Sequence, residues 1–302
     1  MGARARHDRT GRTGILGAER LPPAWRPVEG GAVLVIARPR SAWHVATVVS
    51  TRPETPGSAR IDLDVAGWPG NEAGQHLDVR LTAPDGYTAT RSYSIASSGG
   101  STRVVLAVDR VPDGEVSPFL VDELRVGDRV EVHGPLGGFF VWRPDPITAG
   151  APSPGHRRDP DPSAAPRPVQ LVGGGSGVVP LFAMASAHAA ARDATPFRLL
   201  YSVRSPSDLF FADELAALAT GDPEQPGALR VDLVYTRRAP DGDPRPVGRI
   251  TRERLEATVL PAGAAPRVFV CGSTGFVEAV ASWLLELGHR AQDIRTERFG
   301  GT

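Results

Sequence analysis

The chain has 302 residues, and its 34 Lys and Arg residues balance its 34 Asp and Glu residues. This length suits two domains of ordinary size, and a formal net charge of zero disfavours nucleic acid or an anionic membrane as a partner. One cysteine excludes an internal disulfide framework, and it excludes a cysteine-ligated iron–sulfur cluster, which needs about four thiolates.

Residues 1–42 are rich in Arg, Gly and Pro, and they lack the apolar core of a secretory signal peptide. We expect this N-terminal extension to be largely disordered. The apolar run at 32–37 within it suggests an edge strand or a short docking segment. No apolar run in the chain approaches the roughly 20 residues of a membrane span. The expectation is a cytoplasmic, monomeric protein without a membrane segment.

Residues 43–142 contain short strand-like segments separated by turn residues, such as Pro-Asp-Gly at 84–86. Several short strands at regular spacing indicate a closed antiparallel sheet, so we expect a six-stranded antiparallel barrel. One helical segment, at 116–124, interrupts the strands. The strands are expected at residues 43–50, 59–65, 76–82, 87–95, 103–110 and 129–133.

Residues 143–168 are Pro-rich and predict a linker between two domains. In residues 169–302 strands alternate with helices, which indicates a parallel sheet covered by helices, as in Rossmann-like domains. Ligands of such sheets bind at the carboxyl ends of the strands. The strands are expected at 169–172, 197–203, 231–236, 267–271 and 294–299. The helices are expected at 178–192, 209–219, 251–258 and 274–287.

Residues 91–97 combine a cation, an aromatic ring and small hydroxyl groups at the end of one expected strand. Because side chains alternate between the two faces of a strand, Arg91 and Tyr93 share one face, while Ser92 and Ser94 share the other. This set suits a ligand that carries a phosphate and a planar ring system. The alternative is an ordinary half-buried strand.

Two glycine turns each join an expected strand to an expected helix. Residues 173–177 form the first, where free backbone amides and the helix dipole predict a dinucleotide-phosphate site. Pro180 stands where the usual fingerprint has a small residue. Cys271 and Gly272 begin the second turn. Cys271 would sit at the carboxyl end of its strand, either facing the ligand or as a small buried hydrophobic residue.

Two further segments are weaker candidates. Residues 114–117 form a turn into a helix, where the hydroxyl of Ser117 could meet an anion or could simply cap the helix. Near the C-terminus, Glu297 and Phe299 share a face of an expected strand. An aromatic residue followed by two glycines can fold over a flat ligand, and a frayed chain end is the alternative.

Six motifs stand in an order that resembles the ferredoxin–NADP reductase superfamily, from about residue 43 to the C-terminus. They are Arg-x-Tyr-Ser-x-x-Ser, Gly-x-Val-Ser, Gly-Pro-x-Gly-x-Phe, Gly-Gly-Gly-x-Gly-x-x-Pro, Cys-Gly and a terminal Glu-x-aromatic. In this sequence they occupy residues 91–97, 114–117, 134–139, 173–180, 271–272 and 297–299. Plant-type members usually end at the aromatic residue, whereas three more residues follow it here.

The resemblance implies FAD in the barrel domain, NADP or NAD in the second domain, and no metal site. Arg91 would pair with a flavin phosphate, Tyr93 would lie against the isoalloxazine ring, and Ser94 would reach N5. The catalytic residues that it implies are Ser94, Cys271 and Glu297. The FAD-binding residues that it implies are Arg91, Ser92, Tyr93, Ser94, Gly114, Glu115, Val116, Ser117 and Phe299. The NAD(P)-binding residues that it implies are Gly173, Gly174, Gly175, Ser176, Gly177, Ser202, Arg204, Arg237, Cys271 and Gly272.

The expected function is hydride transfer from NAD(P)H to FAD, followed by electron transfer to a separate acceptor such as a ferredoxin, an oxygenase component, a haem protein or a molybdenum protein. No acid follows the second parallel strand until Asp208, so Ser202 and Arg204 could hold a 2′-phosphate, with Arg237 or Arg238. NADPH is therefore favoured, and NADH stays open. The alternatives are reduction of a small molecule, such as free flavin or a quinone, and a non-catalytic partner-binding module.

Overall fold

A computed structural model describes residues 41–144, 166–219 and 228–299. The chain separates into two units, residues 1–39 and 40–302, and every described residue lies in the second unit. The apolar run at 32–37 and most of the expected linker at 143–168 fall outside the described residues. The domain boundaries expected from the sequence therefore stay predictions.

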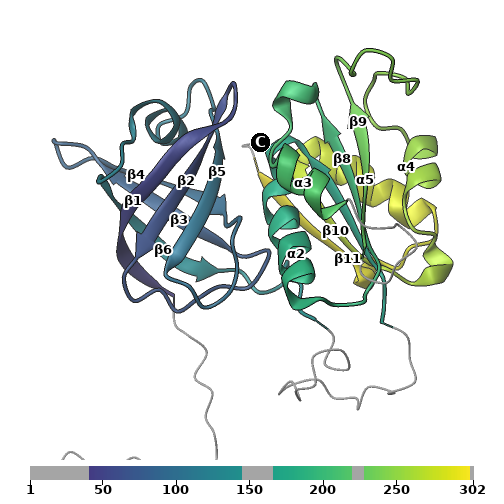
Figure 1. Cartoon of the computed structure of the whole chain (residues 1–302), viewed down its shortest axis with the longest axis horizontal. Helices are drawn as coiled ribbons and strands as arrows, with labels where there is room; N and C mark the ends of the chain where they lie inside the picture. Colours follow the sequence, from purple (N-terminus) through teal and green to yellow (C-terminus); the bar gives the residue numbers. More distant parts are fainter. Residues whose placement is uncertain (1–40, 145–165, 220–227, 300–302) are drawn as a thin grey trace, which may run out of the picture. The chain divides into compact units, whose positions relative to one another are not determined.

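The first part of the described chain is an antiparallel sheet of six strands in the order β4-β3-β6-β1-β2-β5 (Figure 1). Its two edges meet where Ile95 bridges Leu106, and the amide of Ala96 donates to the carbonyl oxygen of Val105 at 2.8 Å. These contacts close the sheet, so the predicted six-stranded antiparallel barrel is confirmed. The strands are β1 (Ala42–Thr55), β2 (Ser58–Val65), β3 (His76–Thr82), β4 (Thr88–Ser94), β5 (Arg103–Asp109) and β6 (Arg129–Leu136).

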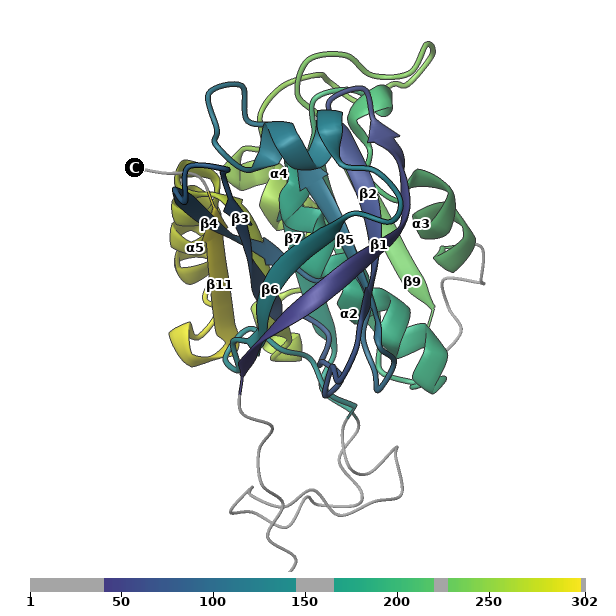
Figure 2. The same cartoon turned by 90° about the vertical axis from the view of Figure 1, so that its left-hand side faces the viewer.

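Alternating burial explains why this segment forms a barrel. In β2, Ile61, Leu63 and Val65 are at most 1% exposed, while the intervening aspartates point outward. Each fully buried aliphatic side chain contributes about 1.5–3 kcal/mol, so the alternation fixes which face of the strand lies inside. The short helix η2 (Phe119–Glu123) adds Leu120 to the same core. Figure 2 shows β1 and β6, which pair antiparallel, side by side.

The second part is a parallel sheet of five strands in the order β11-β10-β7-β8-β9, as the strand–helix alternation predicts. The strands β8 and β11 coincide with the predicted ranges, whereas α3 begins three residues later than expected. The preceding residue, Phe211, has a left-handed φ of 55° that ends the extended chain. The strands are β7 (Val169–Gly174), β8 (Phe197–Val203), β9 (Leu229–Tyr235), β10 (Arg267–Ser273) and β11 (Ile294–Phe299).

Helices cover both faces of this parallel sheet (Figure 1). Alternate strand residues belong to two separate apolar clusters: Leu171 packs with α2 and α3, and its neighbour Val172 packs with α4 and α5. A sheet that is buried on both faces needs such near-continuous apolar strands. No helix in the described ranges has the length and apolarity that a membrane crossing requires. The helices are α2 (Val178–Ala191), α3 (Ala212–Leu218), α4 (Arg252–Thr258) and α5 (Thr274–Glu286).

The barrel and the parallel sheet share direct contacts within residues 40–302. The rings of Phe140 and Phe269 meet edge to face, with centroids 5.4 Å apart. The guanidinium of Arg60 on β2 bonds both Glu54 on β1 and Glu214 on α3. These contacts bring the carboxyl ends of the parallel strands next to the barrel.

Candidate functional site

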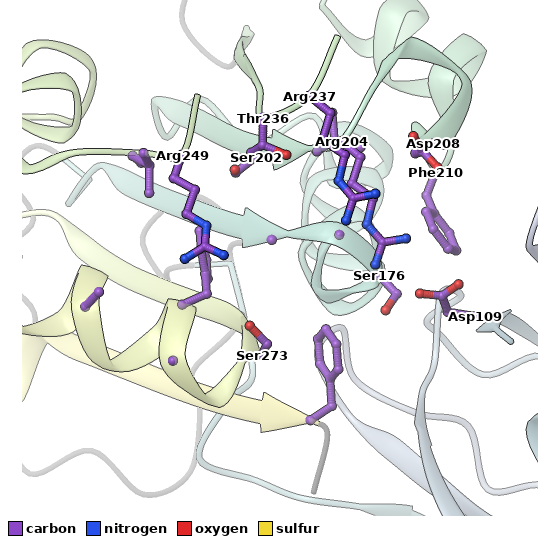
Figure 3. Close-up of a pocket in the computed structure, with 18 of the residues that line it drawn as sticks. Asp109, Ser176, Ser202, Arg204, Asp208, Phe210, Thr236, Arg237, Arg249 and Ser273 are labelled. Carbon is purple, nitrogen blue, oxygen red and sulfur yellow. The ribbon is translucent and has the colours of Figure 1, made fainter. Parts of the chain in front are cut away.

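A cavity of about 700 Å³ opens at the carboxyl ends of the parallel strands (Figure 3). It lies where the strand order reverses, because β7 is flanked by β8 on one side and by β10 on the other. Ligands of open α/β sheets bind at such a switch point, and the volume is that of an ordinary ligand pocket. The position alone therefore favours a nucleotide or a similarly sized ligand.

The glycine turn after β7 forms one wall of the cavity through Gly174, Gly175 and Ser176. The helix α2 begins directly afterwards, and the first amides of a helix have no partners within it, so the turn offers donors to an anion. A Cβ at Gly177 would lie 2.4 Å from the carbonyl oxygen of Cys271. Only glycine permits this approach, which packs the turn against the end of β10 and brings the two predicted glycine turns together.

Three arginines line the cavity, and none of them forms a salt bridge with a described carboxylate. Arg204 follows β8, Arg237 follows β9, and Arg249 precedes α4. In Figure 3 the side chains of Arg204 and Arg237 lie together, and that of Arg249 enters from the other side. None of the three makes an ion pair or a side-chain hydrogen bond with any described residue. Unpaired guanidinium groups around one cavity indicate a ligand with several negative charges.

Sequence reasoning identified Arg204, Arg237 and the buried Ser202 beside them, and it missed Arg249. Arg249 follows a Pro- and Gly-rich stretch far along the chain, with no motif around it. The path of that loop decides whether its side chain reaches the cavity. Arg238 was an alternative to Arg237, and it is exposed but does not line the cavity.

The ends of two barrel strands also line this cavity. Thr55 ends β1, and Asp109 ends β5. Partial burial raises the pKa of the Asp109 carboxyl, and nearby Asp208 raises it further, while the Arg204 guanidinium lowers it. Asp109 therefore places a carboxylate next to the Arg204 guanidinium at this wall of the cavity.

The strand β4 carries the residues predicted for the flavin. The hydroxyl of Ser92 donates to Oδ1 of Asp78 at 2.5 Å, and Ser94 lies opposite His76 in the ladder. Tyr93 is half-buried against the barrel core, and this burial raises the pKa of its phenol to about 12, although Arg91 opposes the shift. The strand thus presents hydroxyls on one face and the Tyr93 ring on the other, as alternation predicts.

A second anion-binding group lies at the turn before η2. The guanidinium of Arg91 and the hydroxyl of Tyr87 both donate to the carboxylate of Glu115, at 2.5 and 2.6 Å. The hydrogen bond from Tyr87 and the charge of Arg91 lower the pKa of Glu115. Val116 is buried in the barrel core, and the hydroxyl of Ser117 accepts a bond from an amide of the preceding turn at 3.0 Å. Sequence reasoning selected Arg91 and Glu115 but not Tyr87.

The remaining predicted residues lie at the ends of β10 and β11. Cys271 is 1% exposed and is not part of the cavity wall, and burial together with Glu297 raises the pKa of its thiol. Glu297 is the neighbour of Cys271 in the parallel ladder, and it faces His76 of the barrel. Phe299 is 40% exposed and stands at the rim of the cavity. A thiol-based mechanism is disfavoured, because the thiolate is the reactive form.

The described residues therefore fit two phosphate-bearing ligands. The donors of Arg91 and Tyr87 converge on the carboxylate of Glu115, and the same donors could bind a phosphate. The glycine turn and the three arginines form a separate cradle at the switch point. Between them, Ser94 of the barrel lies beside His76, which faces Glu297 of the parallel sheet.

Comparison with known protein families also divides the chain into a barrel part and a parallel-sheet part. Residues 64–141 match the oxidoreductase FAD-binding domain, and residues 171–282 match the oxidoreductase NAD-binding domain. The first match covers most of the barrel, and the second covers most of the parallel sheet. The cofactors of this chain are thus FAD and a nicotinamide dinucleotide.

Among curated proteins, ferredoxin–NADP reductase B of Sorangium cellulosum is 31% identical over 264 residues, which covers 84% of this chain and 96% of that protein. The flavohemoprotein of Rhodopirellula baltica is 26% identical over 96% of this chain and 65% of that protein. The reductase subunit of an Amycolatopsis aromatic O-demethylase is 31% identical over 78% of this chain and 62% of that protein. The chain spans less than two thirds of the last two relatives.

Solved structures resemble the chain over both sheets. The FAD/NAD-binding domain of nitric oxide dioxygenase from Vibrio cholerae gives a TM-score of 0.69 at 24% identity, covering 87% of this chain and 100% of that one. A ferredoxin NADP⁺ reductase from Neisseria gonorrhoeae, solved with FAD and NADP, gives 0.64 at 21% identity, covering 85% of this chain and 98% of that one. At these identities the likeness establishes the fold.

Proposed function

The chain belongs to the ferredoxin–NADP reductase superfamily, and on this premise we propose that it takes hydride from NADPH onto a bound FAD and passes electrons to a separate acceptor protein in the cytoplasm. The observation that carries the proposal is the cavity at the β7 switch point, which combines a glycine turn with three unpaired arginines. Such a site suits a dinucleotide with an additional phosphate.

The flavin would be held by the barrel strand β4 and the turn before η2. Arg91 would exchange the carboxylate of Glu115 for a phosphate, since the guanidinium is already placed for an anion. Gly114 and the amide at Ser117 would border the same phosphates. When bound, FAD supplies an acceptor of two electrons that can release them singly. Ser94 and Tyr93 would orient the ring, and the protein would hold the two cofactors in reacting geometry.

The preference for NADPH is proposed from Arg204, Arg237 and Arg249. Replacing Arg204 or Arg249 by Ala should lower kcat/KM for NADPH about 10- to 100-fold, the range for one charge-assisted hydrogen bond. The values for NADH should change much less. Arg238→Ala is the matched control, because Arg238 is exposed beside Arg237 and lies outside the cavity wall. An equal loss for both nucleotides would assign these arginines to binding the shared phosphates.

A separate electron acceptor is proposed because several similar proteins are named as reductase subunits or components. The single cysteine of this chain also leaves no cysteine-ligated cluster to carry the electrons onward. The class of acceptor can be identified from the rate at which each candidate reoxidises the reduced protein. Rapid reoxidation by a ferredoxin or a haem protein would support the proposal, whereas rapid reoxidation only by free flavin or a quinone would favour the small-molecule alternative.

The first experiment is spectroscopic. The purified full-length chain should be yellow, should release FAD on denaturation, and should bleach when NADPH is added without air. Bleaching by NADH should be slower at equal concentration. A colourless protein that cannot be reconstituted with FAD would contradict the proposal and would favour a non-catalytic module with the same fold.

A further inference from the structure

The strand β11 is fastened to the barrel two residues before Glu297. Nη1 of Arg295 donates to the carbonyl oxygens of Phe139 and Val141, both at 3.0 Å. The guanidinium also lies over the ring of Phe139, 5.4 Å from its centroid. Because residues two apart share a face of a strand, Glu297 points to the same side as Arg295. The Arg295 contacts therefore hold Glu297 against the barrel.

Glu297 faces the imidazole of His76, the first residue of β3. Nδ1 of His76 lies 3.4 Å from Oε1 of Glu297, and the two side chains are 28% and 23% exposed. The other oxygen, Oε2, is buried and has no hydrogen-bond partner among the described residues. A buried carboxylate oxygen without a donor is costly. This costly position of the Glu297 carboxylate therefore needs support from its neighbours.

His76 is itself held by its neighbours. It lies opposite Ser94 of β4 in one ladder and opposite Leu136 of β6 in the other. Gly137 closes over the ring, since a Cβ there would lie 3.3 Å from both Cε1 and Nδ1 of His76. Gly137 has a φ of 83°, which glycine adopts without strain. The imidazole is therefore confined by Gly137 on one side while Nδ1 faces Glu297.

We propose that His76 is a positioning residue for Glu297: its imidazole, with Nδ1 3.4 Å from Oε1, keeps the carboxylate beside Cys271 at the end of β10. This role rests on the proposed function, because Glu297 matters only if the nucleotide binds beside it. The other titratable groups near the pair are Cys271 on β10 and Asp78 on β3, with His133 of β6 beyond Asp78. Arg295 is the charged neighbour on β11.

The barrel contains a matched control for this pair. Nδ1 of His133 lies 3.7 Å from Oδ2 of Asp78, with the side chains 27% and 24% exposed. Spacing and exposure are close to those of His76 and Glu297. This second pair lies wholly within the barrel, because both residues belong to the six-stranded sheet. A change at His133 should therefore alter the barrel without moving Glu297.

The first test is the stability of the full chain with its flavin. His76→Leu and Glu297→Gln, made singly and together, should be non-additive by about 2 °C in Tm at about pH 6. His133→Leu combined with Glu297→Gln should be additive. Additivity of His76→Leu with Glu297→Gln at about pH 6 would overturn the proposal.

The second test separates positioning from binding. Rapid mixing with NADPH should show that His76→Leu slows the limiting rate of flavin bleaching about tenfold, with the Kd for NADPH unchanged. His76→Asn should recover most of the rate, since its amide nitrogen can reach Oε1. The double variant with Glu297→Gln should be no slower than the slower single variant. A raised Kd with an unchanged rate, or an equal loss in His133→Leu, would overturn the proposal.

The two tests also keep this inference apart from the proposed function. If NADPH fails to bleach the wild-type flavin, the proposed function is wrong. Coupling in the Tm cycle would in that case still show that His76 holds Glu297, and additivity would show that it does not.

Discussion

The buried ion-pair group around Arg60 leads to the sharpest prediction about stability. Arg60 is 8% exposed, and the side chain of Glu54 is 5% exposed. The guanidinium bonds both Glu54 and Glu214, and it lies 4.6 Å from the ring centroid of Phe211. The amide of Phe211 donates to the second oxygen of Glu54. One arginine therefore neutralises a buried carboxylate at the contact between β1, β2 and α3.

Arg60→Ala should lower the free energy of unfolding by about 3–5 kcal/mol, because it leaves the Glu54 carboxylate buried without its cation. Loss of the contact with Phe211 adds to this, whereas the half-exposed Glu214 adds little. Urea unfolding followed by circular dichroism measures the change. The control is Arg110→Ala, since the Arg110–Asp122 pair is 40% and 48% exposed and should change stability by at most about 1 kcal/mol.

A second set of variants tests the same reasoning if Arg60→Ala does not fold. In the background Arg60→Met, the change Glu54→Gln should be stabilising, because it removes an uncompensated buried charge. The same change in the wild type should be destabilising. A loss below about 1 kcal/mol for Arg60→Ala, or a loss equal to that of Arg110→Ala, would show that water reaches Glu54 and would refute the reasoning.

Three further predictions concern single residues. Arg91→Ala should weaken FAD binding to the apoprotein about 10- to 100-fold, because a charge-assisted hydrogen bond is lost. Flavin titration measures this affinity, and an unchanged affinity would exclude Arg91 from the flavin site. Cys271 should resist iodoacetamide in the folded protein at about pH 8, since its raised pKa keeps the thiol protonated. The same shift should make stability fall as the pH rises above the ordinary thiol value, near pH 8.5, because the unfolded chain then loses a proton that the folded chain keeps; flat stability there would contradict the shift. Gly177→Ala should lower both Tm and nucleotide affinity, because the added Cβ would lie 2.4 Å from the carbonyl oxygen of Cys271. Gly263→Ala is the control: its Cβ would meet nothing within 4 Å, so Tm and nucleotide affinity should not change.

Stability at low pH should also depend on Arg60. The hydrogen bond from Arg60 lowers the pKa of Glu214 in the folded protein, so the folded state prefers the ionised carboxylate. That preference stabilises the protein above the ordinary carboxyl value of 4.5 and is lost as the pH falls below it. Between about pH 5 and pH 3 the free energy of unfolding should therefore fall less steeply in Arg60→Met than in the wild type. Parallel curves would show that Glu214 does not take part.

Local sequence pattern was sufficient to predict three strands with their observed bounds. The strands at 76–82, 197–203 and 294–299 were predicted with the bounds that the structure has, because their apolar periodicity and flanking turns are local signals. The helix expected at 209–219 was too long at its start, since Phe210 and Phe211 pack into the core and Phe211 takes a left-handed φ. Nothing in the sequence around Phe211 indicates that conformation.

The amino-acid sequence by itself determined the barrel, the parallel sheet and the glycine turn after β7, because strand alternation and glycine backbone freedom act over a few neighbouring residues. Only the tertiary structure decided that Arg249 enters the cavity, that the Cys271 thiol is sealed from it, and that His76 meets Glu297. These are encounters between residues far apart in the chain. Their distances depend on how two sheets pack and where loops run, and no local pattern encodes that packing.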